Sequence, residues 1–320
     1  MRFDNRSRVS TYLNTWMPTG DEVPQSVAGY FAGGDGGSYL SSINKIAFPA
    51  ETRTTLVATL TSNRAYLAGM ANSGVAGYSG GGQDSGGNLS GIDKIAFPAD
   101  TKTTLAATLS SQNVFLGAMA NSGTAGYFGG GLDGSNYLSG IDKIAFPADS
   151  KTTLAATLTT GVRRAFGMAN SGTAGYFGGG QTPSLTSRID KITFSADTKS
   201  TLAATLSTAR RDTAAFANSS VAGYFAGGAD AGGYISGIDK ITFSADTKST
   251  LSATLSTAVQ YAGGMSDNLV AGYIAGGEEN GNYPTAIDKI TFPADTKSTL
   301  SATLSAGRQA MAAYADCGVF

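Results

Sequence analysis

Acidic side chains in the most variable stretches of the chain are the groups best suited to hydrolytic chemistry. A glycosidase needs two carboxylates at a suitable separation, and Asp84, Asp133, Asp230, Glu278 and Glu279 lie in such stretches. Their spacing selects no particular pair. The chain has no histidine, which excludes Ser-His-Asp and Cys-His catalysis and imidazole metal sites. We therefore expect no enzymatic activity, no catalytic residue and no cofactor.

A second set of acidic residues recurs in the tetrapeptide Ile-Asp-Lys-Ile, which raises the question of an ion site. Each carboxylate is followed by a lysine, and the copies are far apart along the chain. A hydrogen bond at a turn or between repeats is therefore the expected role, and no metal site is predicted. The residues at this position are Asn44, Asp93, Asp142, Asp190, Asp239 and Asp288.

Aromatic side chains beside planar polar groups occupy the same variable stretches and suit the binding of sugars. An aromatic ring stacks on the C–H face of a sugar, while the sugar hydroxyls need donors and acceptors. Two alternatives are that these loops drift because nothing constrains them, or that they contact a protein partner. The candidate ligand-binding residues are Tyr39, Tyr66, Asn88, Phe115, Tyr137, Arg163, Arg164, Arg210, Arg211, Tyr234, Tyr261 and Tyr283.

A repeat of 48 or 49 residues must position these side chains. Gly-Tyr followed by a glycine cluster recurs at Tyr30, Tyr78, Tyr127, Tyr176, Tyr224 and Tyr273. The third copy predicts four strands, near residues 124–131, 141–146, 153–158 and 165–169, with turn signals at 147–151 and 170–172. Such a unit cannot bury its own apolar faces and must stack on its copies.

Four-stranded antiparallel units repeated around an axis predict an all-β, six-bladed β-propeller over residues 27–320. The ring has to close, because an open edge invites aggregation. Val319 and Phe320 fall in the same repeat phase as Val27 and Ala28. We therefore expect the C-terminal strand to join the first blade, where the innermost strand is missing.

The connections between strands alternate between the two faces of such a disc. The turns at 97–102, 146–151, 194–199, 243–248 and 292–297 are nearly identical, and we call their side the uniform face. The opposite side, the variable face, is expected to carry the loops at 35–40, 83–89, 132–138, 181–185, 229–235 and 278–283. Loops on a rigid scaffold are the usual carriers of recognition.

The repeat resembles the kelch repeat, and more narrowly it is similar to kelch-like repeats in virion and tail-fibre proteins of bacteriophages, especially those infecting cyanobacteria. The likeness lies in Gly-Tyr-Phe-Gly-Gly-Gly at 175–180, Ile-Asp-Lys-Ile at 189–192 and Asn-Ser-Gly at 170–172. It covers about residues 27–320, without the tryptophan usual near the fourth strand.

The resemblance implies a non-enzymatic virion or tail module that recognises host surface polysaccharide through the variable face. One alternative is a structural or decoration protein of the virion that makes protein contacts only. Another is a bacterial protein-interaction module.

Residues 1–26 lie outside the repeat and form a candidate attachment segment to other virion proteins, or else a plug beneath the first blade. Tyr12, Leu13, Trp16 and Met17 are its candidate anchors. The net charge of −1 and the 14% of charged residues argue against a nucleic-acid partner. Without a leader or a long apolar run, we expect no membrane insertion and no signal peptide. The expected location is the virion, after synthesis in the host cytoplasm.

Overall fold

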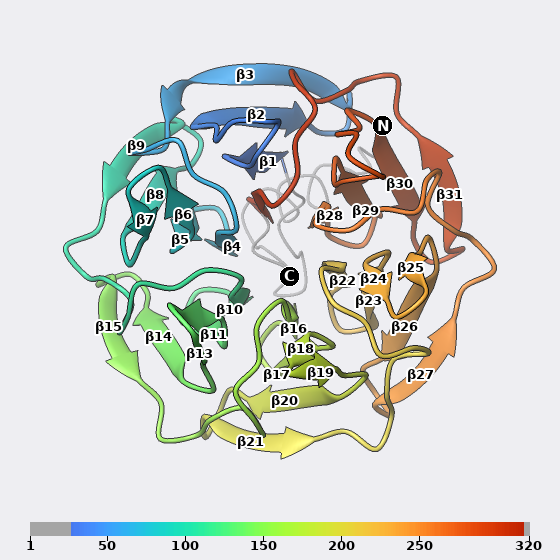
Figure 1. Cartoon of the computed structure of the whole chain (residues 1–320). Coiled ribbons are helices and arrows are strands. Elements are labelled where there is room, and N and C mark those ends of the chain that lie inside the picture. The colour runs from blue at the N-terminus through green and yellow to red at the C-terminus, as the bar shows by residue number, and fades with distance from the viewer. Residues whose placement is uncertain (1–26, 317–320) are drawn as a thin grey trace, which may run out of the picture.

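The computed structural model describes residues 27–316, which form six four-stranded antiparallel sheets around a central axis (Figure 1). The predicted six-bladed β-propeller is confirmed. From the axis outward, the first three blades are β32 (Ala312–Ala315), β1 (Ala28–Ala32), β2 (Ser42–Ala47) and β3 (Thr52–Thr59); β4 (Ala68–Asn72), β5 (Ala76–Gly80), β8 (Ile92–Ala96) and β9 (Thr101–Thr104); and β10 (Gly117–Asn121), β11 (Ala125–Gly129), β14 (Ile141–Ala145) and β15 (Ser150–Thr153).

The other three described blades follow the same order. They are β16 (Phe166–Asn170), β17 (Ala174–Gly178), β20 (Ile189–Thr193) and β21 (Thr198–Thr201); β22 (Ala214–Asn218), β23 (Ala222–Ala226), β26 (Ile238–Thr242) and β27 (Thr247–Thr250); and β28 (Gly263–Asp267), β29 (Ala271–Ala275), β30 (Ile287–Thr291) and β31 (Thr296–Thr299). Short hairpins project from four of the described blades: β6 (Gln83–Asp84) with β7 (Gly87–Asn88), β12 (Leu132–Asp133) with β13 (Asn136–Tyr137), β18 (Gln181–Thr182) with β19 (Ser184–Leu185), and β24 (Ala229–Asp230) with β25 (Gly233–Tyr234).

Both ends of the described chain build the first blade. Strand β32 pairs with β1, with Gly29 opposite Ala315. The backbone N–H of Val27 donates to the Asp316 carboxylate at 2.7 Å. The predicted closure by the C-terminal strand is confirmed, and Val27 and Asp316 meet on the uniform face.

One predicted strand lies elsewhere. In the third copy the outermost strand is β15 (Ser150–Thr153), and residues 154–158 form an irregular connection instead of the expected strand. The reason is the tightness of the preceding turn. Asp149 adopts a left-handed conformation with φ of 53°, so the chain has reversed by residue 150 and pairs at once with β14.

The Gly-Tyr motif joins neighbouring blades in two ways. A Cβ added at Gly126 would lie 2.1 Å from the Met70 sulfur, and one at Gly272 would lie 2.1 Å from the Phe216 ring. The glycine therefore admits a large side chain from the preceding blade. The tyrosine hydroxyl donates to a carboxylate in the next blade: Tyr30 to Asp100, Tyr78 to Asp149, Tyr127 to Asp197, Tyr176 to Asp246, Tyr224 to Asp295 and Tyr273 to Glu51.

The Ile-Asp-Lys-Ile residues also tie one blade to the next. Lys94 forms an ion pair with Asp149 at 2.6 Å. The Asp93 carboxylate accepts hydrogen bonds from the Thr61 backbone at 2.8 Å and from its hydroxyl at 2.6 Å. Thr61 follows β3 of the preceding blade, so the expected blade-to-blade hydrogen bond is confirmed. Among residues 27–316, no three histidine, cysteine or acidic side chains gather closely enough to hold a metal ion.

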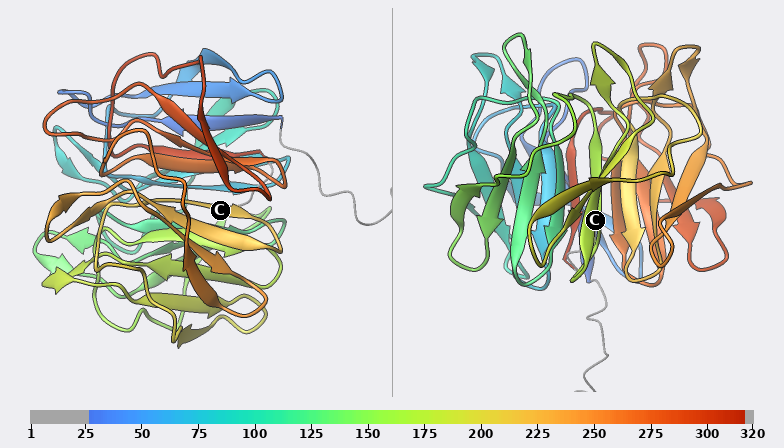
Figure 2. Two further views of the ribbon diagram at one scale, coloured as in Figure 1. Left: turned by 90° about the vertical axis from the view of Figure 1, so that its right-hand side faces the viewer. Right: turned by 90° about the horizontal axis from the view of Figure 1, so that it is seen from below.

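The predicted variable loops and the connections that enter the innermost strands lie on the same side of the disc, as Figure 2 illustrates in side view. The connection that enters each innermost strand forms a backbone bridge to the hairpin, or to the corresponding loop, of the same blade. Ala65 donates to Gln83 at 3.0 Å and Gln83 donates to Ala65 at 2.8 Å. Each bridge ties a hairpin or loop to the connection before the innermost strand of its blade.

Three parts of the sequence interpretation lie outside the described residues. They are the attachment segment at 1–26, its candidate anchors Tyr12, Leu13, Trp16 and Met17, and the C-terminal residues Val319 and Phe320. Within the described range, no helix is long and apolar enough to cross a membrane.

Candidate functional site

The centre of the variable face is formed by one residue from each described blade, which we call the central ring. Every member has φ between 53° and 62°, a left-handed conformation that costs a residue other than glycine about 1–2 kcal/mol. Backbone hydrogen bonds around the axis hold this geometry: Arg164 donates to the Phe115 carbonyl at 2.7 Å, and each other member bonds in the same sense. The members are Tyr66, Phe115, Arg164, Asp212, Tyr261 and Ala310.

Aromatic contacts fill the middle of the central ring. The ring centroids of Tyr66 and Phe115 are 4.6 Å apart, and those of Tyr66 and Tyr261 are 5.6 Å apart. The Arg164 guanidinium carbon lies 4.5 Å from the Phe115 centroid and 5.2 Å from the Tyr261 centroid. Burial raises the pKa of Tyr66 to about 12. These side chains close the central channel of the propeller at the variable face. They form a floor that is partly aromatic.

Asp212 is the buried acidic member of the central ring. Its carboxylate contacts Arg164 at 3.2 Å and Arg211 at 3.1 Å. Burial raises its pKa to about 7, and the two arginines oppose that rise. Its Oδ1 has no hydrogen-bond partner among the described residues. A net positive charge therefore surrounds this part of the floor.

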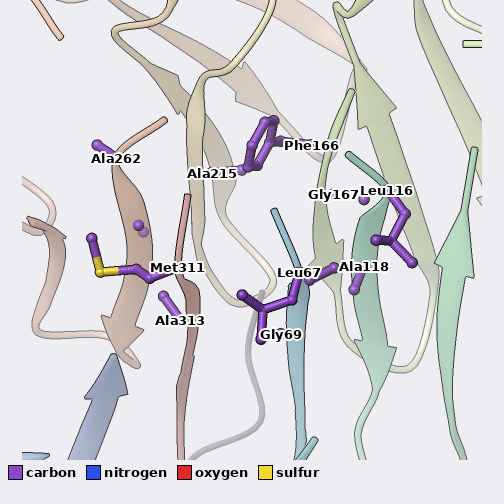
Figure 3. Close-up of a pocket in the computed structure, with 14 residues that line it drawn as sticks. Leu67, Gly69, Leu116, Ala118, Phe166, Gly167, Ala215, Ala262, Met311 and Ala313 are labelled. Carbon is purple, nitrogen blue, oxygen red and sulfur yellow. The ribbon is translucent and has the colours of Figure 1, made fainter. Parts of the chain in front are cut away.

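Beneath this floor the channel is narrow and apolar. Leu67, Leu116, Phe166 and Met311 face a cavity of about 40 Å³, together with small residues of the innermost strands (Figure 3). A second cavity of about 20 Å³ lies against the central ring. Pockets for small organic ligands measure roughly 300–1,000 Å³. Neither cavity is large enough to hold a ligand of that size.

A second circle of residues, which we call the outer ring, stands on the four hairpins and on the corresponding loops of the other two described blades. These side chains are half-buried, so that part of each stays open to solvent. The Tyr39 hydroxyl donates to Gln83 at 3.2 Å, and the Gln260 amide donates to the Tyr234 hydroxyl at 3.4 Å. Such hydrogen bonds fix the direction of the rings. The outer ring comprises Tyr39, Asn88, Tyr137, Leu185, Tyr234 and Tyr283.

Arginines connect the two rings on one side of the face. The Arg163 guanidinium carbon lies 5.3 Å from the Tyr137 ring centroid and 5.9 Å from that of Phe115. Arg163 also donates to the Gln181 amide oxygen at 3.2 Å, and Arg211 donates to the same oxygen at 3.5 Å. The predicted residues Tyr137, Arg163 and Arg211 are therefore brought together.

Arg210 is a predicted site residue that does not reach the face. It is 1% exposed and forms an ion pair with Asp239 at 3.0 Å inside its blade. Burial lowers the pKa of its guanidinium. Arg64 makes the equivalent ion pair with Asp93 at 2.9 Å. Arg210 is thus part of the blade interior, whereas its neighbour Arg211 lies on the surface.

Most of the acidic residues considered for catalysis stabilise hairpins. Asp84 accepts the backbone N–H of Gly86 at 2.8 Å, and Asp230 accepts that of Gly232 at 2.7 Å. Glu278 accepts the Gln260 amide at 2.7 Å. Asp84, Asp133 and Asp230 belong to different hairpins. These contacts give Asp84, Asp230 and Glu278 a structural role in their loops.

Asp212, Gln181 and Gln260 are site residues that sequence reasoning missed. Aligning the repeats with one another would have identified two of them. Asp212 occupies the same repeat position as Tyr66, and Gln260 occupies the same repeat position as Arg163. The candidate residues were chosen by side-chain type, as aromatic residues, arginines and Asn88. Selection by repeat position would have added these polar members.

No protein-family model matches the chain, and no curated protein matches it. The class of protein is therefore defined by the fold. The described residues form a six-bladed β-propeller, consistent with a kelch-like repeat, in which two circles of variable side chains gather on one face.

Proposed function

We propose that the protein is a non-enzymatic binding module that recognises saccharides of a host cell surface through the variable face. The observation that carries the proposal is the pair of concentric rings. Half-exposed tyrosines stand around a floor made of Tyr66, Phe115 and Tyr261, with amide and guanidinium groups between them. This combination of flat apolar surfaces and fixed polar groups suits sugar rings.

The rigidity of the platform supports binding over random drift of the loops. Backbone bridges hold each hairpin, and the hydrogen-bonded central ring holds the floor. A preorganised surface loses little conformational entropy when a ligand binds. Repetition around the axis would also let a long polysaccharide contact several blades at once, which raises the overall affinity.

The position of Val27 supports attachment to a larger particle. Val27 and Asp316 meet on the uniform face, so attachment through residues 1–26 would leave the variable face pointing outward. With the resemblance of the repeats to phage virion and tail proteins, this arrangement supports a place on a phage tail or virion surface. Other virion proteins would then be the partners of the N-terminal segment.

Screening of the full chain on immobilised glycans and host polysaccharide tests the proposal. Joint substitution Tyr137→Ala and Tyr283→Ala should abolish binding and leave the melting temperature almost unchanged, because both side chains are half-buried on surface loops of the variable face. The control is Val75→Ala with Val221→Ala on the uniform face, where both valines are exposed. Absence of binding by the wild-type chain, or full binding by the tyrosine variant, would refute the proposal.

One feature of the outer edge of the first blade supports a second candidate function, that of a structural or decoration protein of the virion. Val57 is fully exposed on β3, which runs for eight residues where the outermost strands of the other described blades have four. An exposed apolar residue on a long edge strand suits a packing partner. In that case Val57→Asp should abolish incorporation into particles, and the tyrosine variant should assemble normally.

A further inference from the structure

Two neighbouring blades direct arginines toward one neutral oxygen on the variable face. Arg163 precedes β16 and Arg211 precedes β22, and these innermost strands belong to adjacent blades (Figure 1). Both guanidinium groups donate to the Gln181 amide oxygen, at 3.2 Å and 3.5 Å. These lengths exceed the usual 2.9–3.0 Å. Two cations therefore share one weak, uncharged acceptor.

The charge balance leaves Arg163 without a carboxylate. Arg211 and Arg164 both contact Asp212. Among residues 27–316, Arg163 forms no ion pair, and its Nε is buried without a hydrogen-bond partner. An ionised acceptor makes hydrogen bonds about twice as strong as a neutral one. An oxyanion in place of the Gln181 oxygen would therefore bind both arginines more strongly than Gln181 does.

The position of the Gln181 amide oxygen between the two arginines is open to the variable face. The Arg211 side chain is 31% exposed. Tyr137 stands on the hairpin of the preceding blade, and Tyr234 stands on the hairpin whose base pairs with Arg211 through Ala229. The intervening hairpin carries Leu185 at the outer-ring position. A sugar ring lying over Leu185, between the hairpins of Tyr137 and Tyr234, would have a tyrosine on either side and arginines beneath it.

We infer that Arg163 and Arg211 form a subsite for the oxyanion of an acidic saccharide, a carboxylate or a sulfate ester. The subsite rests on the proposed function of the variable face and specifies its substrate class. The anionic group displaces the Gln181 amide oxygen and accepts hydrogen bonds from both guanidinium groups. The sugar ring then stacks on Tyr137 or Tyr234.

Titration of the full chain with three probes tests the subsite. The probes are galacturonic acid oligomers, the same oligomers with their carboxyl groups reduced to alcohols, and a sulfated galactan. The wild-type chain should bind an acidic probe roughly tenfold to a hundredfold more tightly than the reduced oligomer. The preference should weaken as salt is added. A stronger response to the galactan than to galacturonate would identify sulfate as the group bound.

Two variants separate loss of the subsite from loss of the fold. Arg163→Gln with Arg211→Gln removes the cations, and Gln181→Glu keeps them but supplies an internal carboxylate at the ligand's place. Both should lose the preference for acidic probes and retain binding of the reduced oligomer. Arg53→Gln is the matched control, because Arg53 is an exposed arginine on β3, and it should bind as the wild type does.

Acidic probes that bind equally well to the wild type and to both variants would overturn the subsite. So would equal affinity of the wild type for the acidic and the reduced oligomers. If the wild type binds the oligomers in either of these ways and the Tyr137→Ala, Tyr283→Ala variant does not bind them, the proposed function stands and the subsite alone fails. If no probe binds and glycan screening is also negative, both fail.

Discussion

Asp212 is the central-ring residue whose chemistry differs most from that of its counterparts. The equivalent positions hold mainly aromatic side chains, whereas this one holds a buried carboxylate between Arg164 and Arg211. Its backbone N–H donates to Arg164 and its carbonyl accepts from Tyr261. The residue thus belongs both to the scaffold and to the charged part of the variable face.

The pH dependence of the free energy of unfolding tests this environment of the Asp212 carboxylate. The folded-state pKa of about 7 exceeds the ordinary 3.8, so the native state holds the proton more tightly than the unfolded chain does. Its contribution to stability is fully present below about pH 4 and is lost as the pH rises through about 7. Asp212→Asn should flatten this decline in the free energy of unfolding, measured with denaturant between about pH 4 and about pH 7. Asp230→Asn, at a hairpin tip, is the control.

An unchanged slope in Asp212→Asn would mean that the carboxylate stays ionised throughout. Residue type and order could not predict this environment. Arg210, Arg211 and Asp212 are consecutive, yet the first lies inside the blade, the second on the surface and the third in the central ring. Asp212 itself has a left-handed backbone, and only the assembled ring explains why a residue other than glycine adopts it.

The strand carrying Gly-Tyr is the element that determines blade spacing. Its glycine lies against a side chain from the innermost strand of the preceding blade, and its tyrosine bonds forward to the next blade. The sequence predicted the strand and the need for the repeats to stack on one another. It could not identify the partner, because Met70 and Gly126 are separated by more than one repeat and meet only after the blades stack.

Alanine substitutions at three glycines should show graded costs. Gly272→Ala places Cβ 2.1 Å from the rigid Phe216 ring and should cost about 3 kcal/mol, since overpacking typically costs about 1–3 kcal/mol. Gly126→Ala meets the flexible end of Met70 and should cost about 1 kcal/mol. Gly91→Ala meets nothing within 4 Å and should be neutral. Equal unfolding free energies for all three variants would contradict the proposed packing role.

The whole molecule depends on closure between its two described ends. Strand β32 is the innermost strand of the first blade, and it packs between β28 and β4 of the neighbouring blades. The repeat phase was enough to predict this closure, and with it the gathering of the variable loops on one face. The plugged channel was beyond prediction, because it depends on how side chains from separate blades meet at the axis.

A chain ending at Gln309 should lose cooperative thermal unfolding, because β1, β4 and β28 are then left without their neighbour. A peptide of residues 306–320, supplied in trans, should restore the transition by occupying the vacant place. A scrambled peptide of the same composition is the control. Cooperative unfolding of the truncated chain without any peptide would mean that the ring is stable when open.

Hydrogen exchange of the full chain with and without a bound acidic oligosaccharide would locate the binding surface. We predict slower exchange at 132–138, 181–185 and 229–235, on the hairpins around Arg163 and Arg211, and no change at the turns 97–102, 146–151 and 194–199. Slower exchange at those turns, or nowhere in the chain, would contradict recognition through the variable face.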